Sequence, residues 1–431
     1  METDSNIKQR VVLAGINITT KSKNNSDIDI YDSMKELEEL AQAAGAEVVA
    51  TSVQNKDTYD AAYFIGKGKA EEIGQIAQNM ECDTIIFNDE LSGVQIKNLE
   101  QISGVRVIDR TMLILDIFAK RALSKEGKLQ VELAQQKYNL SHLIGVGTSL
   151  SRLGGGIGTR GPGEKKLETD RRHIDRRILE IKKSLEEVDR NRMTQRQKRS
   201  KSGLPLVALV GYTNSGKSTI LNEMIKLNKD YDKEKEVFAK DMLFATLDTA
   251  LRKCTLPSNL DILLTDTVGF VSQLPHDLVE SFKATLEEVR YADLLLHVVD
   301  LSNEKYQLQM QTTKKVLSEL GVENKKILYV FNKADKLNYE TQIAVDDPFV
   351  IISATKKYNL DKLYSEIEKI LLASRKKVDM KIPYKDSNIL AQLKSKYQFE
   401  QTYDEDSVNI TLNIDQQDIN IYKEYIIAEK K

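Results

Sequence analysis

Two short stretches of this chain have the residue types and the spacing that nucleotide binding requires. Residues Gly211 to Ser218 read GYTNSGKS, which fits the phosphate-loop pattern G-x-x-x-x-G-K-[ST]. In such a loop the glycines let backbone N–H groups turn toward the phosphates, Lys217 reaches the β- and γ-phosphates, and the Ser218 hydroxyl binds Mg²⁺. An apolar run at 205–210 precedes the loop, and a helical pattern follows it. This strand–loop–helix context predicts a nucleotide site.

The second stretch, NKAD at Asn332 to Asp335, selects the base. Asp335 can accept two hydrogen bonds from guanine, one from N1–H and one from the exocyclic amine, and adenine lacks this donor pair. Asn332 suits the other edge of the base, and the stem of Lys333 can lie over the ring. Since NKAD follows the apolar run 326–331, it is expected at a strand's carboxyl end, where open α/β sheets bind ligands. The sequence therefore predicts a site for GTP and GDP.

Two segments between these motifs fit the same site. Residues 261–269 form an apolar run that ends in Asp266-Thr-Val-Gly269, the pattern D-x-x-G. We expect Asp266 to hold Mg²⁺ through a water molecule and the Gly269 N–H to sense the γ-phosphate. Upstream, residues 244–249 read FATLDT and offer a threonine that can complete the metal shell when GTP is bound.

Three nearby residues allow both a functional and a structural interpretation. Ser353, which opens Ser-Ala-Thr after an apolar run, is expected to brace the guanine from behind, although alone it would be an ordinary turn serine. Phe270 stands where many GTPases have a glutamine that orients the attacking water. Its ring cannot hydrogen-bond water, so intrinsic hydrolysis should be slow and depend on a partner or an added ion. Asn214 is similar in position to the residue with which potassium-activated GTPases bind a monovalent cation, and an ordinary loop residue is an equal alternative.

The composition of the 431-residue chain indicates a protein with about three domains and substantial cores, since 41% of its residues are hydrophobic. The net charge of -2 gives no global signal for a nucleic-acid partner. Cys82 and Cys254 are too few for a disulfide framework and fit a reducing compartment. The first ten residues show no apolar targeting segment, and no apolar run approaches the roughly 18 residues of a membrane span. We expect a cytoplasmic monomer without stable membrane insertion.

Hydrophobic periodicity divides the chain into four predicted parts. Residues 1–118 alternate short apolar strands with helical patterns, which predicts a mostly parallel α/β domain. Residues 119–203 are predicted to form a helical hairpin with a glycine-rich loop, and residues 204–373 the P-loop GTPase domain. Residues 379–431 read as a small α+β C-terminal domain without an identifiable catalytic residue. The predicted fold class is α/β.

The predicted hairpin combines an apolar seam with a basic arm. Residues 112–143 are helical in pattern, with Gly127 as a candidate interruption, and the ten residues 154–163 are too rich in glycine to form a core. Between Arg160 and Lys201 there are 15 Lys/Arg against 8 Asp/Glu. A solvated helix face explains that charge, and so does an arm that follows RNA phosphates. The seam typical of a coiled coil is Leu167, Ile174, Ile178, Ile181, Leu185 and Val188.

Several stretches resemble the HflX family of GTPases. They are 64–70 (FIGKGKA), 107–118 (VIDRTMLILDIF), 127–134 (GKLQVELA), 154–172 (GGGIGTRGPGEKKLETDRR), 275–282 (PHDLVESF) and 285–288 (TLEE). The resemblance covers about residues 10–370, including an N-terminal half that generic GTPases lack. It implies an Mg²⁺-dependent GTPase that converts GTP to GDP and phosphate. It further implies binding to the large ribosomal subunit and its ribosomal RNA through the helical domain, and dissociation of ribosomes that are stalled or idle under stress.

The resemblance also completes the predicted site. Related GTPases have their metal ligand at the position of Thr246 in a similar FATLD stretch, so Thr246 is preferred to Thr249, although Thr249-Ala-Leu replaces the Pro-Thr-Thr of many relatives. Lys217, Thr246 and Gly269 are the predicted catalytic residues; Ser218 and Thr246 are the predicted Mg²⁺ ligands, with Asp266 acting through water. The predicted nucleotide-binding residues are Gly211, Tyr212, Thr213, Asn214, Ser215, Gly216, Lys217, Ser218, Phe244, Ala245, Thr246, Leu247, Asp248, Asp266, Thr267, Val268, Gly269, Asn332, Lys333, Ala334, Asp335, Ser353, Ala354 and Thr355.

Two other function classes compete with this interpretation. The chain could be a signalling GTPase whose helical hairpin binds a protein partner without RNA, or an RNA-remodelling ATPase. Competition between nucleotides separates ATP from GTP, and sedimentation with ribosomes separates the ribosomal from the signalling hypothesis.

Overall fold

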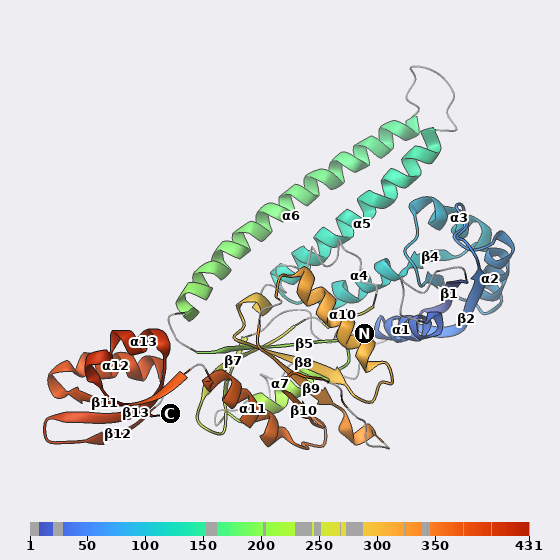
Figure 1. Ribbon diagram of the computed structural model, residues 1–431. Coiled ribbons are helices and arrows are strands. Elements are labelled where there is room, and N and C mark those ends of the chain that lie inside the picture. Colours follow the sequence, from blue (N-terminus) through green and yellow to red (C-terminus); the bar gives the residue numbers. More distant parts are fainter. Residues whose placement is uncertain are drawn as a thin grey trace, which may run out of the picture. The chain divides into compact units, whose positions relative to one another are not determined.

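The structure is a computed structural model, and it falls into two compact units. The first unit comprises residues 1–188, 241–248 and 271–283, and the second comprises 189–240, 249–270 and 284–431. Figure 1 traces the chain through both units. The residues that the structure describes are 8–19, 29–151, 162–200, 204–228, 244, 251–267, 269–272, 288–322, 325–337, 343, 345–373, 375–397 and 399–430.

The first unit begins with a four-stranded parallel sheet in the order β2-β1-β3-β4. Its strands are β1 (Arg10–Ile18), β2 (Glu47–Lys56), β3 (Thr84–Phe87) and β4 (Arg106–Asp109). Parallel strands need crossover connections, and three helices supply them: α1 (Ile30–Ala43), α2 (Lys67–Asn79) and α3 (Gly93–Ser103). This confirms the predicted parallel α/β fold. The strand order reverses between β1 and β3, the kind of position at which open α/β sheets bind ligands.

Three helices follow: α4 (Arg110–Arg121), α5 (Lys125–Ser151) and α6 (Pro162–Ser200). The predicted helical segment 112–143 is therefore divided at residues 122–124, and the interruption does not fall at Gly127. The Gly127 N–H donates to the Ser124 hydroxyl over 2.9 Å, so Ser124 caps a new helix and Gly127 lies in its first turn. The capping Ser124, and not Gly127, therefore marks the boundary between α4 and α5.

Helices α5 and α6 form the predicted hairpin and lie side by side (Figure 1). The Arg177 guanidinium on α6 binds both carboxylate oxygens of Glu132 on α5, at 2.6 and 2.9 Å. The glycine-rich loop up to Gly161 lies outside the described residues. The seam positions that pack with Leu129, Leu133 and Leu140 of α5 are Ile174, Ile178, Ile181 and Leu185.

The second unit contains a six-stranded sheet in the order β10-β9-β8-β5-β7-β6, in which only β6 is antiparallel to its neighbour. The strands are β5 (Leu206–Gly211), β6 (Leu251–Thr255), β7 (Asp261–Asp266), β8 (Leu294–Asp300), β9 (Ile327–Asn332) and β10 (Phe349–Ile351). Helices α7 (Lys217–Ile225), α10 (Tyr306–Glu319) and α11 (Leu360–Leu372) accompany them. Because the parallel strands end at one edge, the loops after β5, β7 and β9 converge there.

The C-terminal part is an antiparallel sheet in the order β12-β13-β11-β14, formed by β11 (Arg375–Pro383), β12 (Phe399–Tyr403), β13 (Ser407–Asp415) and β14 (Ile426–Lys430). Helices α12 (Ser387–Lys396) and α13 (Gln416–Ile421) complete the predicted α+β fold. Alternate residues of β13, from Val408 to Ile414, are buried, as expected of a strand with one face on a core. In the described part of the chain, no helix combines the length and the apolar character that crossing a membrane requires.

Candidate nucleotide-binding site

The phosphate loop lies between β5 and α7, and Lys217 is the first residue of that helix. Its ammonium is buried and donates to the Gly211 carbonyl over 3.1 Å and to the Tyr212 carbonyl over 2.8 Å. Burial lowers the pKa of Lys217 to about 8, and the nearby charge of Asp266 opposes that shift. Phosphate oxygens are stronger partners for an ammonium than neutral carbonyls, so this position favours a polyanionic ligand.

Gly216 shows why the loop needs glycine. Its φ is +96°, and a Cβ built there would stand 2.1 Å from the Nδ2 atom of Asn332. That amide is buried, donates to the Ser215 carbonyl over 2.9 Å and accepts from the Ala354 N–H over 3.0 Å. Asn332 thus joins the phosphate loop to the loop after β10. These contacts give Asn332 a bracing role, and its contact with the guanine base stays a prediction.

The predicted base-recognition residues lie together at the ends of β9 and β10. The Ser353 hydroxyl donates to Asp335 Oδ1 over 2.5 Å and accepts from the Lys356 N–H over 3.1 Å. Ser353 therefore does more than form a turn, because it fixes one carboxylate oxygen of Asp335. Lys333 has a φ of +64°, and its ammonium lies 2.8 Å from the Asp300 carboxylate at the end of β8. Asp300 was not predicted, although the apolar run that it ends is visible in the sequence.

Ser218 and Asp266 form a pair of oxygen donors at the predicted magnesium site. The Ser218 hydroxyl donates to Asp266 Oδ2 over 2.6 Å, and the Thr267 N–H donates to Asp266 Oδ1 over 2.9 Å. Asp266 is buried. The predicted Mg²⁺ ligands bind through hydroxyl and carboxylate oxygens, which are the ligand atoms that Mg²⁺ prefers. The residues present fit the ion, with phosphate oxygens and water left to complete its shell.

The D-x-x-G glycine packs directly onto the phosphate loop. A Cβ at Gly269 would stand 2.8 Å from the Thr213 Cα and 3.0 Å from the Lys217 Nζ, so a side chain there would displace both. The next residue, Phe270, forms two backbone hydrogen bonds with the same loop. Its N–H donates to the Gly211 carbonyl (3.2 Å), and its carbonyl accepts from the Thr213 N–H (2.7 Å). The Phe270 ring is buried and brings no group that could orient water.

Two buried hydroxyls of the phosphate loop, Thr213 Oγ1 and Ser215 Oγ, have no hydrogen-bond partner among the described residues. Buried polar groups are normally paired, so these two favour a polar ligand at the loop. Between them, Asn214 has a φ of +59°, a region that asparagine tolerates better than most residues. Its backbone therefore already gives a structural reason for asparagine.

The remaining predicted positions fall into two groups. Thr267 donates to the Leu209 carbonyl over 2.7 Å, Ala334 N–H donates to the Ile352 carbonyl over 3.1 Å, and Thr355 Oγ1 lies 3.3 Å from the Ser353 hydroxyl. Phe244 belongs to the first unit, where it is buried against Phe118 of α4. Predicted positions that lie outside the described residues are Ala245, Thr246, Leu247, Asp248 and Val268.

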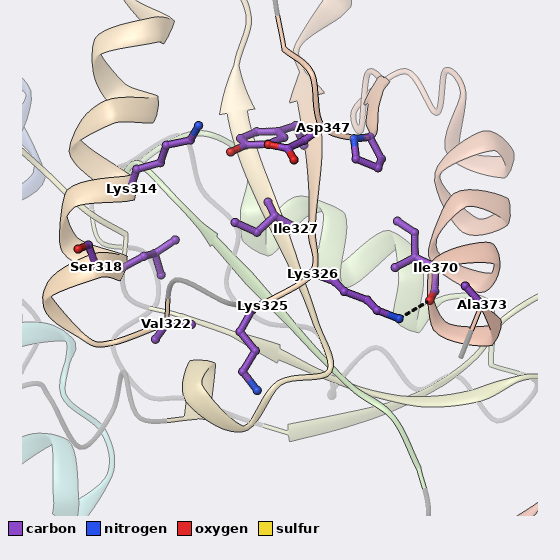
Figure 2. Close-up of a pocket in the computed structure, with 12 residues that line it drawn as sticks. Lys314, Ser318, Val322, Lys325, Lys326, Ile327, Asp347, Ile370 and Ala373 are labelled. Atoms are coloured by element: carbon purple, nitrogen blue, oxygen red, sulfur yellow. Dashed lines mark hydrogen bonds between the residues drawn. The ribbon is translucent and has the colours of Figure 1, made fainter. Parts of the chain in front are cut away.

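Figure 2 shows a different hollow of the second unit, a cavity of about 600 Å³ at the amino end of β9. Ile327 and Tyr329 line it together with Lys314 and Lys325, and Lys326 donates to the Ile370 carbonyl over 3.2 Å. The phosphate loop and NKAD lie at the carboxyl ends of their strands, so this cavity lies at the opposite end of the sheet from them.

Models of three protein regions match the chain. Residues 31–119 match "GTP-binding GTPase N-terminal", residues 121–199 match "GTP-binding GTPase Middle Region", and residues 206–333 match "50S ribosome-binding GTPase". A GTP-binding protein of Sulfolobus solfataricus in complex with GDP aligns with a TM-score of 0.45 and 25% identity, over 84% of this chain and 99% of that one.

Curated relatives cover nearly the whole chain. "GTPase HflX" of Caldanaerobacter subterraneus subsp. tengcongensis is 46% identical over 96% of this chain and 93% of its own length. "GTPase HflX" of Escherichia coli K12 is 39% identical, with 90% of each chain covered. The structure agrees with these relatives, because it brings the phosphate loop, the D-x-x-G glycine and NKAD together at one edge of the sheet. The chain belongs to the HflX family of GTPases, and it hydrolyses GTP.

Proposed function

We propose that this GTPase binds the large ribosomal subunit and dissociates stalled or idle ribosomes as part of a cytoplasmic stress response. The match of residues 206–333 to a model described as a 50S ribosome-binding GTPase carries this proposal. Matches to the N-terminal and middle regions support it, because they extend the likeness to the parts that a generic GTPase lacks. The protein acts as a monomer with the four parts 1–118, 119–203, 204–373 and 379–431.

The hairpin supports an RNA contact. Helix α6 has 39 residues, which corresponds to a length of about 58 Å. The side chains of Arg171 and Arg172 are 59% and 74% exposed, and each pairs with an acid one turn away, Asp175 at 3.7 Å and Glu168 at 2.6 Å. Exposed pairs of this kind contribute little to stability, so phosphates can replace the acids at small cost. Ribosomal RNA of the large subunit is the proposed partner of this arm.

In the proposed reaction, the phosphate loop from Gly211 to Ser218 holds the phosphates, Lys217 binds the β- and γ-phosphates, and Asp335 recognises guanine. Bound Mg²⁺, held by Ser218 and Thr246 with Asp266 through water, would supply charge neutralisation at the phosphates. Water attacks the γ-phosphorus, the bond to the β-phosphate oxygen breaks, and GDP and phosphate leave. Since the Phe270 ring brings no hydrogen-bonding group, we expect hydrolysis to depend on the partner or on an added ion.

Hydrolysis by the free protein should therefore be slow, and large ribosomal subunits should raise it by orders of magnitude. Phosphate release is measured with and without purified large and small subunits, and sedimentation in a gradient reports binding. Lys217→Ala, which removes the phosphate-binding ammonium, is the control for contaminating GTPases. Equal turnover with and without subunits, together with no co-sedimentation, would contradict the proposal and favour the signalling GTPase with a protein partner.

We further propose that Asn214 binds potassium, and replacing potassium by sodium should then lower the hydrolysis rate. Asn214→Gly tests this cleanly, because glycine keeps the left-handed backbone at φ +59° and removes only the amide. The variant should retain GDP affinity and lose the difference between the two cations. If the wild-type rate is the same in potassium and sodium, Asn214 is an ordinary loop residue.

A further inference from the structure

A buried polar cluster lies at the carboxyl edge of the N-terminal sheet. Arg110, the first residue of α4, is 3% exposed and donates from NH1 to the Asn88 side-chain oxygen over 3.0 Å. Asn88 follows β3 and also accepts from the Ser33 hydroxyl on α1 over 3.0 Å. The other end of the guanidinium, NH2, pairs with the carboxylate of Glu36 on α1. The sequence assigned no function to any of these residues.

This cluster holds a residue 162 positions further along the chain. Arg110 NH2 donates to the Ser272 hydroxyl over 3.0 Å and to the Ser272 carbonyl over 3.3 Å. Glu36 accepts from the Ser272 N–H over 3.3 Å and from the Ser272 hydroxyl. Ser272 is 3% exposed, so all its polar groups meet Arg110 or Glu36 away from bulk water. Ser272 and the N-terminal sheet belong to the same compact unit.

The contact between Ser272 and the cluster lies where the strand order of the N-terminal sheet reverses. Asn88 and Ser33 follow β3 and β1, the two strands between which the strand order reverses. Open α/β sheets bind their ligands at this position, and here it receives a segment of the chain itself. Helix α4 makes a second such contact: Phe118 meets Phe244 edge to face, with ring centroids 4.6 Å apart. Phe244 opens the stretch that contains the predicted metal ligand Thr246, so α4 contacts a residue two positions before that ligand.

We propose that Arg110 and Glu36 are positioning residues for GTP hydrolysis, because they fix Ser272 and through it the γ-phosphate contact of Gly269. Only Phe270 and Val271 separate Gly269 from Ser272, and the backbone of Phe270 is itself tied to the phosphate loop. The cluster therefore fixes a residue three positions after the D-x-x-G glycine. This inference rests on the γ-phosphate role of Gly269 in the proposed function.

The chemistry of the cluster favours a fixed position over a loose one. A buried guanidinium and carboxylate are costly unless each is paired and hydrogen-bonded, and Ser272 supplies two acceptors and two donors to them. Withdrawing Ser272 would leave both charges short of partners. The cluster thus stabilises one position of Ser272, which follows the glycine that reads the γ-phosphate by three residues. GDP has no γ-phosphate, so the cluster should influence GTP binding and leave GDP binding unchanged.

The test compares the affinities for GDP and for a non-hydrolysable GTP analogue, together with single-turnover hydrolysis, in Ser272→Ala, Arg110→Gln and the double variant. In the single variants the affinity for the analogue relative to GDP should fall roughly tenfold, which is the worth of one hydrogen bond to a charged group. The hydrolysis rate should fall at least as far. The double variant should match the more affected single variant, because both changes break one contact.

Three controls separate the possible failures. Lys120→Ala removes a cation of the same helix that donates to the Ala44 carbonyl, and it should leave the affinity ratio unchanged. Gly269→Ala should lower the ratio; if it does not, the γ-phosphate assignment fails and the inference with it. If Gly269→Ala lowers the ratio while folded Ser272→Ala and Arg110→Gln proteins keep the wild-type ratio, the positioning role alone is overturned. Unchanged GDP affinity verifies folding of the Ser272, Arg110 and Lys120 variants, and a faster hydrolysis in Ser272→Ala would also overturn the proposal.

Discussion

Asp335→Asn should lower the affinity for GTP by roughly a hundredfold or more and raise the relative affinity for xanthosine triphosphate. The carboxylate can accept from both guanine donors, and losing one charge-assisted bond while facing a second donor costs about 3 kcal/mol or more. Xanthine presents one donor and one acceptor on that edge, which suits an amide. Ser353 directs the outcome, because it donates to Oδ1 and would keep the amide NH₂ pointing the other way, toward the base.

Competition of labelled GDP with GTP, ATP and xanthosine triphosphate measures this change in specificity. Asp361→Asn makes the same chemical change at an exposed position in the first turn of α11 and should leave all three affinities unaltered. A variant at position 335 that prefers GTP by the wild-type margin would show that another residue recognises the base. Preference for ATP in the wild-type protein would exclude the guanine site altogether.

The sequence predicted the loops of the nucleotide site because each motif follows an apolar run. GYTNSGKS, D-x-x-G and NKAD each come after a strand of one parallel sheet, and parallel strands bring their carboxyl ends together. The partners within the site were harder to predict, since they depend on distances between strands. The sequence predicted Asn332 at the base, but it gave no sign that both polar atoms of this side chain also bind the backbone of neighbouring loops. Asp300 was missed because no motif marks β8.

The N-terminal half shows a similar limit. Alternating apolar runs and helical patterns predicted its parallel sheet. Hydrophobic residues recur every 2 positions in a half-buried strand and every 3.6 positions in a helix, and segments of this length distinguish the two. The same reasoning offered Gly127 as a candidate interruption of the helix that follows. In the structure a new helix starts there instead, and its cap is Ser124, three residues before Gly127. The contact between Arg110 and Ser272 leaves no local signature at all, since the two residues are 162 positions apart and neither lies in a spacing pattern.

Replacing Arg160, Arg171 and Arg172 by alanine should weaken ribosome binding and reduce ribosome splitting still further. If all three arginines contact phosphates, the dependence of log affinity on log salt should flatten by about two to three units. Splitting should fall more than binding, because other basic surfaces keep the protein on the subunit while the arm no longer engages the RNA. Sedimentation at several salt concentrations measures the slope, and the loss of intact ribosomes in gradients measures splitting.

The triple arginine variant tests RNA contact and not folding, because the three arginines lie outside the apolar seam that joins α5 and α6. Among the residues that the structure describes, Arg171 and Arg172 are exposed and pair with acids of α6 itself, whereas α5 is held by Ile178, Ile181 and the Arg177–Glu132 pair. Helicity, melting temperature and GTP affinity should therefore stay at wild-type values. Removing the same charge from the C-terminal part, with Lys381, Lys394 and Lys423 changed to alanine, controls for net charge. If the arginine variant binds and splits ribosomes as the wild type does, the arm is a solvated helix face.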